Sequence, residues 1–283
     1  MVGKQIKTFD LSRFQQMACY NKLTKSAYDE NIRVVPAYEM LHKCLVDEMT
    51  AYAKKATTRY EFKGIDPKTG RYCEGSRGAA STLGTVELGV GTGHSSDLLL
   101  DAIPQMKLTG IEVLDNMVEA SKERLIEKHG EKRVSILQGD YFAMLERSAL
   151  RREWKTLCGS SIVFSVISVH HVADEMKRWL IRDAYNILQN GGIFVLADLM
   201  LPSDPKKQKE VMEAAEANLI KNATTPEIRD EWLRHWRELN ILGTVENHLK
   251  WFVEAGFSNV RHVFSELTTN MIVGVKEPCL GEY

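Results

Sequence analysis

The stretch VELGVGTGHSS, residues 86–96, decides how the rest of the sequence is interpreted. It joins a short apolar run to a predicted helix and holds glycines at alternate positions, Gly89, Gly91 and Gly93. Backbone N–H groups exposed by such a loop at a helix start favour anionic or polar ligands. The Gly-Lys-Ser/Thr of a P-loop is missing, and His94 stands where a GxGxxG fingerprint has its third glycine. Taken alone, the loop also fits a tight turn without a ligand.

Downstream of this loop, apolar runs alternate with helical periodicity. Five apolar runs are predicted as strands: 85–88, 107–113, 134–140, 161–169 and 193–200. Helices are predicted between them at 96–103, 115–130 and 174–190, the last capped by Gly191 and Gly192. A helix at 244–256 then precedes two strands, 259–267 and 270–276, predicted as an antiparallel hairpin. This order predicts an α/β fold with a doubly wound, mostly parallel seven-stranded sheet covered on both faces.

Two segments lie outside that core. Residues 1–80 show helical patterns at 15–23 and 36–56 and then enter a loop at 66–81, so we predict an N-terminal helical cap and linker. Residues 203–242 contain two charged amphipathic helices, at 206–222 and 226–240, which predict a helical insertion that acts as a lid. The predicted units are therefore 1–80, the ligand-binding core 81–202, the insertion 203–242, and 243–283, which completes the core.

The composition limits the partners and the compartment. Lys and Arg (37) nearly balance Asp and Glu (38) among 283 residues, which does not favour a nucleic-acid partner. The polar N-terminus lacks the apolar core of a signal peptide, and the apolar runs are too short to span a bilayer. The five cysteines are scattered and lack CxxC spacing. We therefore predict a cytoplasmic protein without a metal site, a disulfide framework or a membrane segment.

Acidic residues stand at successive predicted strands. Glu87 lies in the first strand, Glu112 ends the second, 19 residues after Gly93, and Asp140 ends the third. Open α/β sheets bind ligands at the carboxyl ends of their strands, where a carboxylate after the second strand can hold a ribose diol. A single such carboxylate is more often a helix cap or a solvated turn residue. Three of them in register predict a shared ligand-binding crevice.

These motifs resemble those of the class I S-adenosylmethionine-dependent methyltransferases. VELGVGTGHSS matches the acidic-start glycine motif, GIEVLDNMVEAS the ribose-binding strand and helix, and LQGDYFAM the adenine-side motif. The segment IVFSVISVHHVADEMKRWLIRDAYNILQNGGIFVLADLM resembles the fourth strand through the fifth. YDENIRVVPAYEMLHK also resembles the covering helix of small-molecule members and of the carboxy-S-adenosylmethionine synthase group. The resemblance spans about residues 84–200 plus the terminal helix and hairpin, and it implies a Rossmann-like methyltransferase fold.

The resemblance also implies S-adenosylmethionine as cofactor. It assigns nine residues to that cofactor: Glu87, Gly89, Gly91, Gly93, Glu112, Met117, Asp140, Tyr141 and Ser168. Glu87 and the glycine loop would hold the methionine end, together with the serine. Glu112 would bind the ribose hydroxyls, although the family more commonly has Asp there. Asp140 would accept from the adenine amino group, with Met117 and Tyr141 beside the ring.

Candidates for the chemistry lie just beyond the fourth and fifth predicted strands. His170, His171 and Asp198 are predicted as catalytic or acceptor-orienting residues, because a general base is needed only when the acceptor must lose a proton. Strand alternation would point the adjacent histidines to opposite sides, so we expect at most one to face the pocket. A structural role for each of them is the alternative.

Candidates for substrate binding lie in the added segments: Tyr20, Tyr28, Arg33, Tyr38, Trp232, His235, Trp236 and Arg237. Trp232, His235 and Trp236 are spaced i, i+3 and i+4 and so share one helix face. That face either packs on the core or closes over a small substrate. Arg33 or Arg237 would then contact a carboxylate or phosphate of the substrate.

The sequence predicts an enzyme that transfers a methyl group from S-adenosylmethionine to a small-molecule acceptor by in-line displacement. One alternative is a same-fold enzyme that performs other chemistry on the cofactor, as in carboxy-S-adenosylmethionine synthesis. Others are a methyltransferase that modifies tRNA or protein, and a non-catalytic binding protein. A homodimer through the terminal hairpin or the insertion is compatible with the sequence, which leaves the acceptor atom open.

Overall fold

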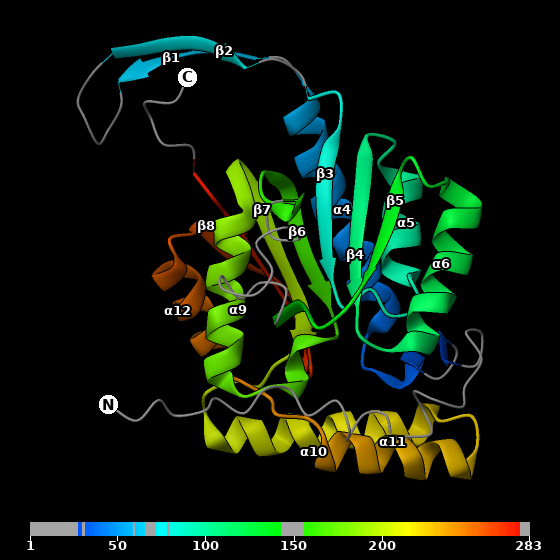
Figure 1. The fold of residues 1–283 in the computed structure, drawn as a ribbon. Coiled ribbons are helices and arrows are strands. Elements are labelled where there is room, and N and C mark those ends of the chain that lie inside the picture. The colour runs from blue at the N-terminus through cyan, green and yellow to red at the C-terminus, as the bar shows by residue number, and fades with distance from the viewer. Residues whose placement is uncertain are drawn as a thin grey trace, which may run out of the picture.

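The computed structural model describes residues 28–29, 32–58, 60–65, 72–77, 80–142 and 156–277. Its centre is a seven-stranded sheet in the order β5-β4-β3-β6-β7-β9-β8 (Figure 1). The strands are β3 (Leu83–Leu88), β4 (Met106–Glu112), β5 (Val134–Gln138), β6 (Ser160–Val166), β7 (Leu188–Leu199), β8 (Ser258–Glu266) and β9 (Thr269–Val275). The first five run parallel, and β9 is antiparallel to both β7 and β8. This confirms the predicted mostly parallel seven-stranded sheet.

Helices cover both faces of this sheet (Figure 1). One layer contains α4 (Tyr38–Thr57), α5 (His94–Ala102) and α6 (Asp115–His129), and the other contains α9 (Asp174–Ile187) and α12 (Val245–Ala255). Alternate strand residues enter the two cores: Phe164 packs in the first, and Val163 in the second. Both residues are apolar because both faces of β6 are buried, which is why apolar residues follow one another from Ile162 to Phe164.

The helix α4 belongs to the sheet's own core. Leu41, Leu45 and Met49 are fully buried in the first layer. Part of the predicted N-terminal cap is therefore a structural layer of the α/β core. The helix predicted at 15–23 lies outside the described residues.

The predicted fourth strand, 161–169, is too long. β6 ends at Val166, Ile167 has a left-handed φ of 49°, and Val169–His171 forms the short 3-10 helix η2. Val169 remains apolar because it is buried in the second core. An apolar run therefore extended beyond the strand and did not mark where the backbone turns.

Two other predicted boundaries are also wrong. α9 ends at Ile187 and β7 begins at once, so Gly191 and Gly192 lie inside a strand and do not cap the helix. The register of the β6–β7 ladder shifts between Ser160 and Ile162, and this shift accommodates the additional β7 residues around Gly191 and Gly192. The predicted loop at 66–81 contains β2 (Tyr72–Arg77), which pairs antiparallel with β1 (Tyr60–Ile65).

The predicted insertion forms two helices that cross beneath the carboxyl ends of the parallel strands (Figure 1). They are α10 (Pro205–Asn222) and α11 (Pro226–Glu238). Each begins with proline after a residue whose side chain accepts a backbone N–H, Asp204 for α10 and Thr225 for α11, which explains where the helices start. None of the helices in the described part of the chain has the length and apolar character needed to cross a membrane.

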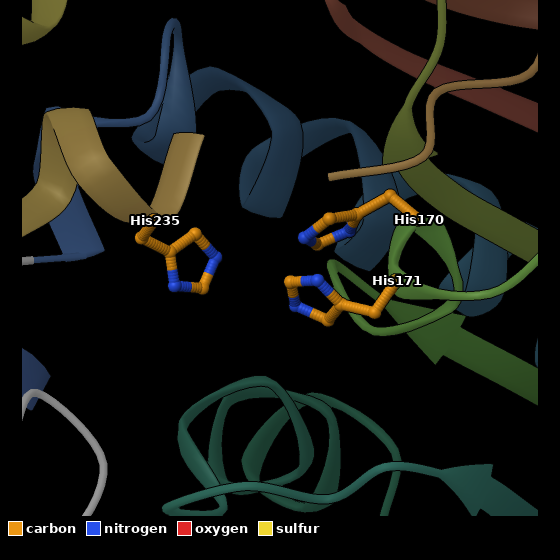
Figure 2. Close-up of side chains that lie close together, drawn as sticks. All are labelled: His170, His171 and His235. Atoms are coloured by element: carbon orange, nitrogen blue, oxygen red, sulfur yellow. The ribbon is translucent and has the colours of Figure 1, made fainter. Parts of the chain in front are cut away.

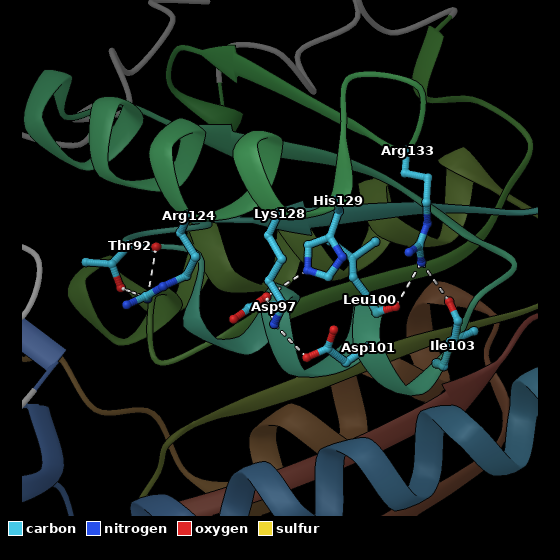
Figure 3. Close-up of polar contacts among 9 residues, drawn as sticks. All are labelled: Thr92, Asp97, Leu100, Asp101, Ile103, Arg124, Lys128, His129 and Arg133. Atoms are coloured by element: carbon cyan, nitrogen blue, oxygen red, sulfur yellow. Dashed lines mark hydrogen bonds and ion pairs between the residues drawn. The ribbon is translucent and has the colours of Figure 1, made fainter.

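Basic residues of α6 hold the glycine loop and α5 (Figure 3). Arg124 donates through Nη1 to the carbonyl and the hydroxyl of Thr92, both at 3.0 Å. Asp97 of α5 accepts from Lys128 at 2.8 Å and from His129 at 2.7 Å. The position of the glycine loop thus depends on a helix that follows it in the chain.

Arg133 secures the other end of α5. Its Nη2 donates to the carbonyls of Leu100 (2.9 Å) and Ile103 (3.1 Å) (Figure 3). Its Nε donates to the carbonyl of Met106 (3.3 Å). Hydrogen bonds from charged donors contribute roughly 1.5–3 kcal/mol each.

We expect Arg133→Ala to lower the free energy of unfolding in urea by about 2–3 kcal/mol. The control Arg178→Ala, which removes an exposed ion pair, should lower it by less than about 1 kcal/mol. Equal losses would contradict the role given to Arg133.

Candidate functional site

A cavity lies at the carboxyl ends of β3, β4, β5 and β6. The chain places β4 and β5 on one side of β3 and then starts β6 on the other, so the order of the parallel strands reverses here. Ligand sites of open α/β sheets form in the crevice that such a switch point leaves. The lining comes mainly from residues 87–95, 112–117, 140–142 and 166–171. We call this the strand-end cavity.

The strand-end cavity brings together eight of the nine residues predicted for cofactor binding. Gly93 is the exception, because it is not among the lining residues. It begins α5 with a left-handed φ of 81°, and a Cβ there would come within 2.9 Å of Leu125 in α6. Gly93 thus allows close packing of α5 on α6. Gly89 has a φ of 79°, and a Cβ there would clash with the Ser168 hydroxyl, so Gly89 lets β3 and β6 approach each other.

Glu112 ties the end of β4 to the glycine loop. Its buried carboxylate accepts from the backbone N–H groups of Gly91 (2.9 Å), Val113 (2.8 Å) and Leu114 (3.0 Å). Burial raises the pKa of Glu112, and the three donors oppose that rise. An ionised carboxylate has about four acceptor positions, so one position on Oε2 remains.

Glu87 is a buried carboxyl group beneath the glycine loop, with 1% of its surface exposed. Burial raises its pKa to about 8, Ser96 opposes this by donating a hydrogen bond, and the charge of Glu112 adds to it. Glu87 is therefore largely protonated at neutral pH. A cation bound beside it would favour the ionised form.

The opposite wall of the strand-end cavity follows β5 and β6. Asp140 accepts from the backbone N–H of Phe142 at 2.8 Å, which shapes the turn after β5. The Tyr141 hydroxyl lies 3.3 Å from the Ser168 hydroxyl, and burial raises the pKa of Tyr141 so that it stays neutral. Met117 adds an apolar surface from the first turn of α6.

His170 and Asp198 form a buried pair beside this cavity. Asp198 stands near the end of β7 and accepts from the backbone N–H groups of Val169 (2.7 Å) and Leu199 (2.8 Å). It also lies 2.5 Å from Nδ1 of His170. An ionised Asp198 can only accept, so the His170 ring carries its hydrogen on Nδ1 and turns Nε2 away from the carboxylate.

The two adjacent histidines line different cavities. His171 lines the strand-end cavity and His170 a second one. The prediction assumed strand alternation, but both residues lie in the 3-10 helix η2. Their ring centroids are 3.8 Å apart. Burial lowers the pKa of His171 well below its usual value, and the neighbouring histidines reinforce that shift. His171 is therefore neutral at neutral pH.

The second cavity lies between η1 (Ile32–Val34), η2 and α11, and we call it the α11 cavity. It shares Tyr28, Ile32 and Ile167 with the strand-end cavity, so the two spaces adjoin. Its lining is mostly aliphatic and aromatic. His170 and His171 lie at the boundary between the two spaces.

The predicted aromatic face of α11 both packs and lines this cavity. Trp232, His235 and Trp236 are buried, and the two tryptophans pack in a cluster with the η1 residues. All three also line the α11 cavity. Burial lowers the pKa of His235 to about 3, so this ring is neutral. The indole N–H groups of both tryptophans are buried and have no hydrogen-bond partner among the described residues.

The predicted tyrosines and arginines divide between the cavities and the surface. Tyr38 lines the strand-end cavity and Tyr28 lines both cavities, whereas Tyr20 lies outside the described residues. Arg33 and Arg237 are exposed and paired with glutamates, and neither is among the residues described as lining these two cavities. Both guanidinium groups thus lie at the hydrated surface in this structure, and the anion contact stays a prediction.

A clamp that the sequence did not predict holds residues 28–29 over the site. Asp29 forms an ion pair with Arg124 and accepts from the Thr92 hydroxyl at 2.6 Å. Because Tyr28 is adjacent to Asp29, the clamp places it at both cavities. His42 of α4 likewise bonds Ser95 in the first turn of α5 at 2.9 Å. The partners lie far apart in the chain, so no local pattern marked them.

The comparisons with known proteins agree with this geometry. Residues 86–194 match a family model described as a methyltransferase domain. An uncharacterized methyltransferase of Oceanobacillus iheyensis is 31% identical over 44% of this chain and 51% of its own length. Flavonoid 3'-O-methyltransferase 3 of Mentha piperita is 23% identical over 60% of this chain and 41% of its own length. The chain thus matches about half or less of the length of these curated relatives.

Solved structures share the fold. An O-methyltransferase family protein from Burkholderia thailandensis superposes with a TM-score of 0.51 at 13% identity, over 69% of this chain and 51% of that one. An O-methyltransferase family 2 protein from Planctomyces limnophilus, in complex with apigenin, gives 0.50 at 13% identity, over 68% and 49%. The predicted Rossmann-like methyltransferase fold is confirmed.

We expect Asp198→Asn to release His170 from a single tautomer. An amide keeps one acceptor oxygen but turns an NH₂ group toward N–H donors, so at least one of the three hydrogen bonds is lost. ¹⁵N NMR of the imidazole should show a new population with the hydrogen on Nε2. The unfolding free energy should fall by about 1–3 kcal/mol. Asp204→Asn, which keeps a good helix cap, is the control and should change neither result. An unaltered His170 spectrum in D198N would contradict the assignment.

Proposed function

We propose that this chain, which carries a methyltransferase domain at residues 86–194 and has the Rossmann-like methyltransferase fold, methylates a hydroxyl group of a small molecule with S-adenosylmethionine. One observation carries the proposal. The strand-end cavity and the apolar α11 cavity adjoin, and His170, which pairs with buried Asp198, lines the α11 cavity next to His171, which lines the strand-end cavity. Donor and acceptor would therefore lie side by side next to a base once the α11 cavity, about 30 Å³ in volume here, opens to admit the acceptor.

The lining of the strand-end cavity fits S-adenosylmethionine. Glu87 would pair with the methionine ammonium group, and the remaining acceptor position of Glu112 would take a ribose hydroxyl. Asp140 would accept from the adenine amino group, with Met117 and Tyr141 beside the ring. The cofactor supplies an electrophilic methyl group. The close approach of Gly89 to Ser168 would close the glycine loop around the methionine end of the cofactor.

The α11 cavity suits a compact, largely apolar acceptor that carries oxygen atoms. Aliphatic and aromatic groups line it, and the buried indole N–H groups of Trp232 and Trp236 can donate to acceptor oxygens. The apigenin and flavonoid in the descriptions of the Planctomyces and Mentha proteins support a phenolic acceptor. The surface positions of Arg33 and Arg237 give no support to chemistry that needs an anion-binding arginine, as in carboxy-S-adenosylmethionine synthesis.

His170 would act as the base. With its hydrogen on Nδ1 bound by Asp198, the ring presents Nε2 to accept the proton of the acceptor hydroxyl. Asp198 would stabilise the resulting imidazolium and keep the ring oriented. The helices α10 and α11 cover the carboxyl ends of the strands and would exclude water from the reacting groups (Figure 1).

We also propose a cytoplasmic location and a homodimer. The dispersed cysteines favour the cytoplasm, and Cys44 and Cys158 are free thiols in the described structure. The edge strand β8 offers a surface through which a homodimer could form.

The activity test uses purified protein, methyl-labelled S-adenosylmethionine, a panel of phenols and a metabolite extract, with mass spectrometry of what gains the methyl group. His170→Ala should lower kcat by roughly 10²–10⁴-fold, because it removes a general base. Its Kd for the cofactor should stay near the wild-type value. The control His262→Ala changes an exposed histidine of β8 and should keep full activity. Failure to label any small molecule, or full activity in H170A, would refute the proposal.

Cofactor binding should release a proton between about pH 6 and 8. Glu87 has a pKa of about 8 in the free protein and would ionise beside the bound ammonium group, so affinity should rise with pH up to about 8. Calorimetry in buffers of different ionisation enthalpy measures the number of protons released. Glu87→Gln should abolish the release and weaken binding, whereas Glu119→Gln at an exposed position should do neither. Proton-independent binding in the wild type would contradict this assignment.

A further inference from the structure

Three histidines converge at the boundary between the two cavities. His170 and His171 come from η2, and His235 comes from α11. One ring nitrogen of each lies within 4.8 Å of the corresponding nitrogens of the other two. Figure 2 shows the three rings facing a common space from opposite sides. Such convergence of nitrogen donors from separate elements is the basic requirement of a histidine metal site.

The surroundings of the cluster also match such a site. Metal-ligating histidines commonly donate their second ring N–H to a carboxylate or backbone carbonyl, which orients the ring. His170 has this arrangement, because Nδ1 lies 2.5 Å from Asp198 and leaves Nε2 for a ligand. Asp198 is itself held by two backbone N–H groups. His170 and His235 are each 3% exposed, and His171 is partly buried.

We propose that His170, His171 and His235 bind a divalent transition-metal ion of the zinc class. Imidazole donors favour zinc, copper, nickel and cobalt over magnesium and calcium, which prefer oxygen ligands. Three protein ligands leave a coordination position for a further group. Because the cluster lies between the two cavities, that position adjoins the space assigned to the acceptor. The sequence predicted no metal site, since His235 is far from the other two histidines in the chain.

Metal binding has one consequence that rests on the proposed function. A metal ion and a proton compete for Nε2 of His170, so the metal-loaded protein loses its base. Methyl transfer should therefore fall as the site fills and return after chelation. Metal binding itself does not depend on the methyltransferase assignment, so failure of either statement can be recognised separately.

The binding test uses the full chain after chelator treatment and gel filtration. Titration with Co²⁺ should give one ion per chain and the visible absorption of a low-symmetry, nitrogen-ligated ion, and Zn²⁺ should displace it. His235→Ala and the more conservative His235→Gln should each weaken Co²⁺ binding by at least about tenfold. Circular dichroism and S-adenosylmethionine binding establish that each variant is folded.

A second cluster, Asp97, Asp101 and His129, provides the matched control. His129→Ala should leave Co²⁺ affinity unchanged if the ion binds at the three histidines. In the wild-type protein, Zn²⁺ should shift the ring ¹⁵N resonances of His170, His171 and His235 but not that of His129. This readout requires no variant to fold. Absence of stoichiometric binding to the wild type, or binding lost in H129A but kept in both His235 variants, would overturn the proposal.

Discussion

The site depends on a buried carboxylate that is satisfied almost entirely by backbone. Glu112 at the end of β4 accepts three backbone N–H groups, one of them from Gly91 in the glycine loop. A buried charge is tolerable only when such donors compensate for lost water. This requirement holds the loop against the strand ends and places Glu112, Glu87 and the loop around one space. The geometry of the strand-end cavity is thus a consequence of satisfying one buried charge.

The helical insertion shows how one helix face can both pack against the protein and line a cavity. The aromatic face of α11 buries Trp232 and Trp236 against η1, and this burial stabilises the helix in its place beneath the sheet. The same face forms a wall of the α11 cavity and brings His235 beside His171. Packing and ligand binding were alternatives at the level of sequence. In the structure the same face packs and lines a cavity, because a helix that covers the strand ends also encloses the space beneath them.

The predictions that held were those that depend on regular geometry. Parallel strands end at one edge of a sheet, so Glu112 and Asp140 could be expected to share a crevice, and both line the strand-end cavity. The predictions that failed concern places where the regular pattern stops. The apolar residues after Val166 enter a 3-10 helix, and Gly191 lies within β7. Apolar character reports burial, and it does not report the backbone conformation that achieves it.

By itself, the sequence determined the α/β class, the glycine loop and the acidic strand ends, because each depends only on local spacing and periodicity. Only the tertiary structure decided which distant residues meet. Asp29 and Arg124 are 95 positions apart, yet they clamp the N-terminal segment to the glycine loop. His235 joins the η2 histidines only because α11 folds back beneath the sheet. Such contacts arise from the packing of whole elements, which local sequence patterns do not encode.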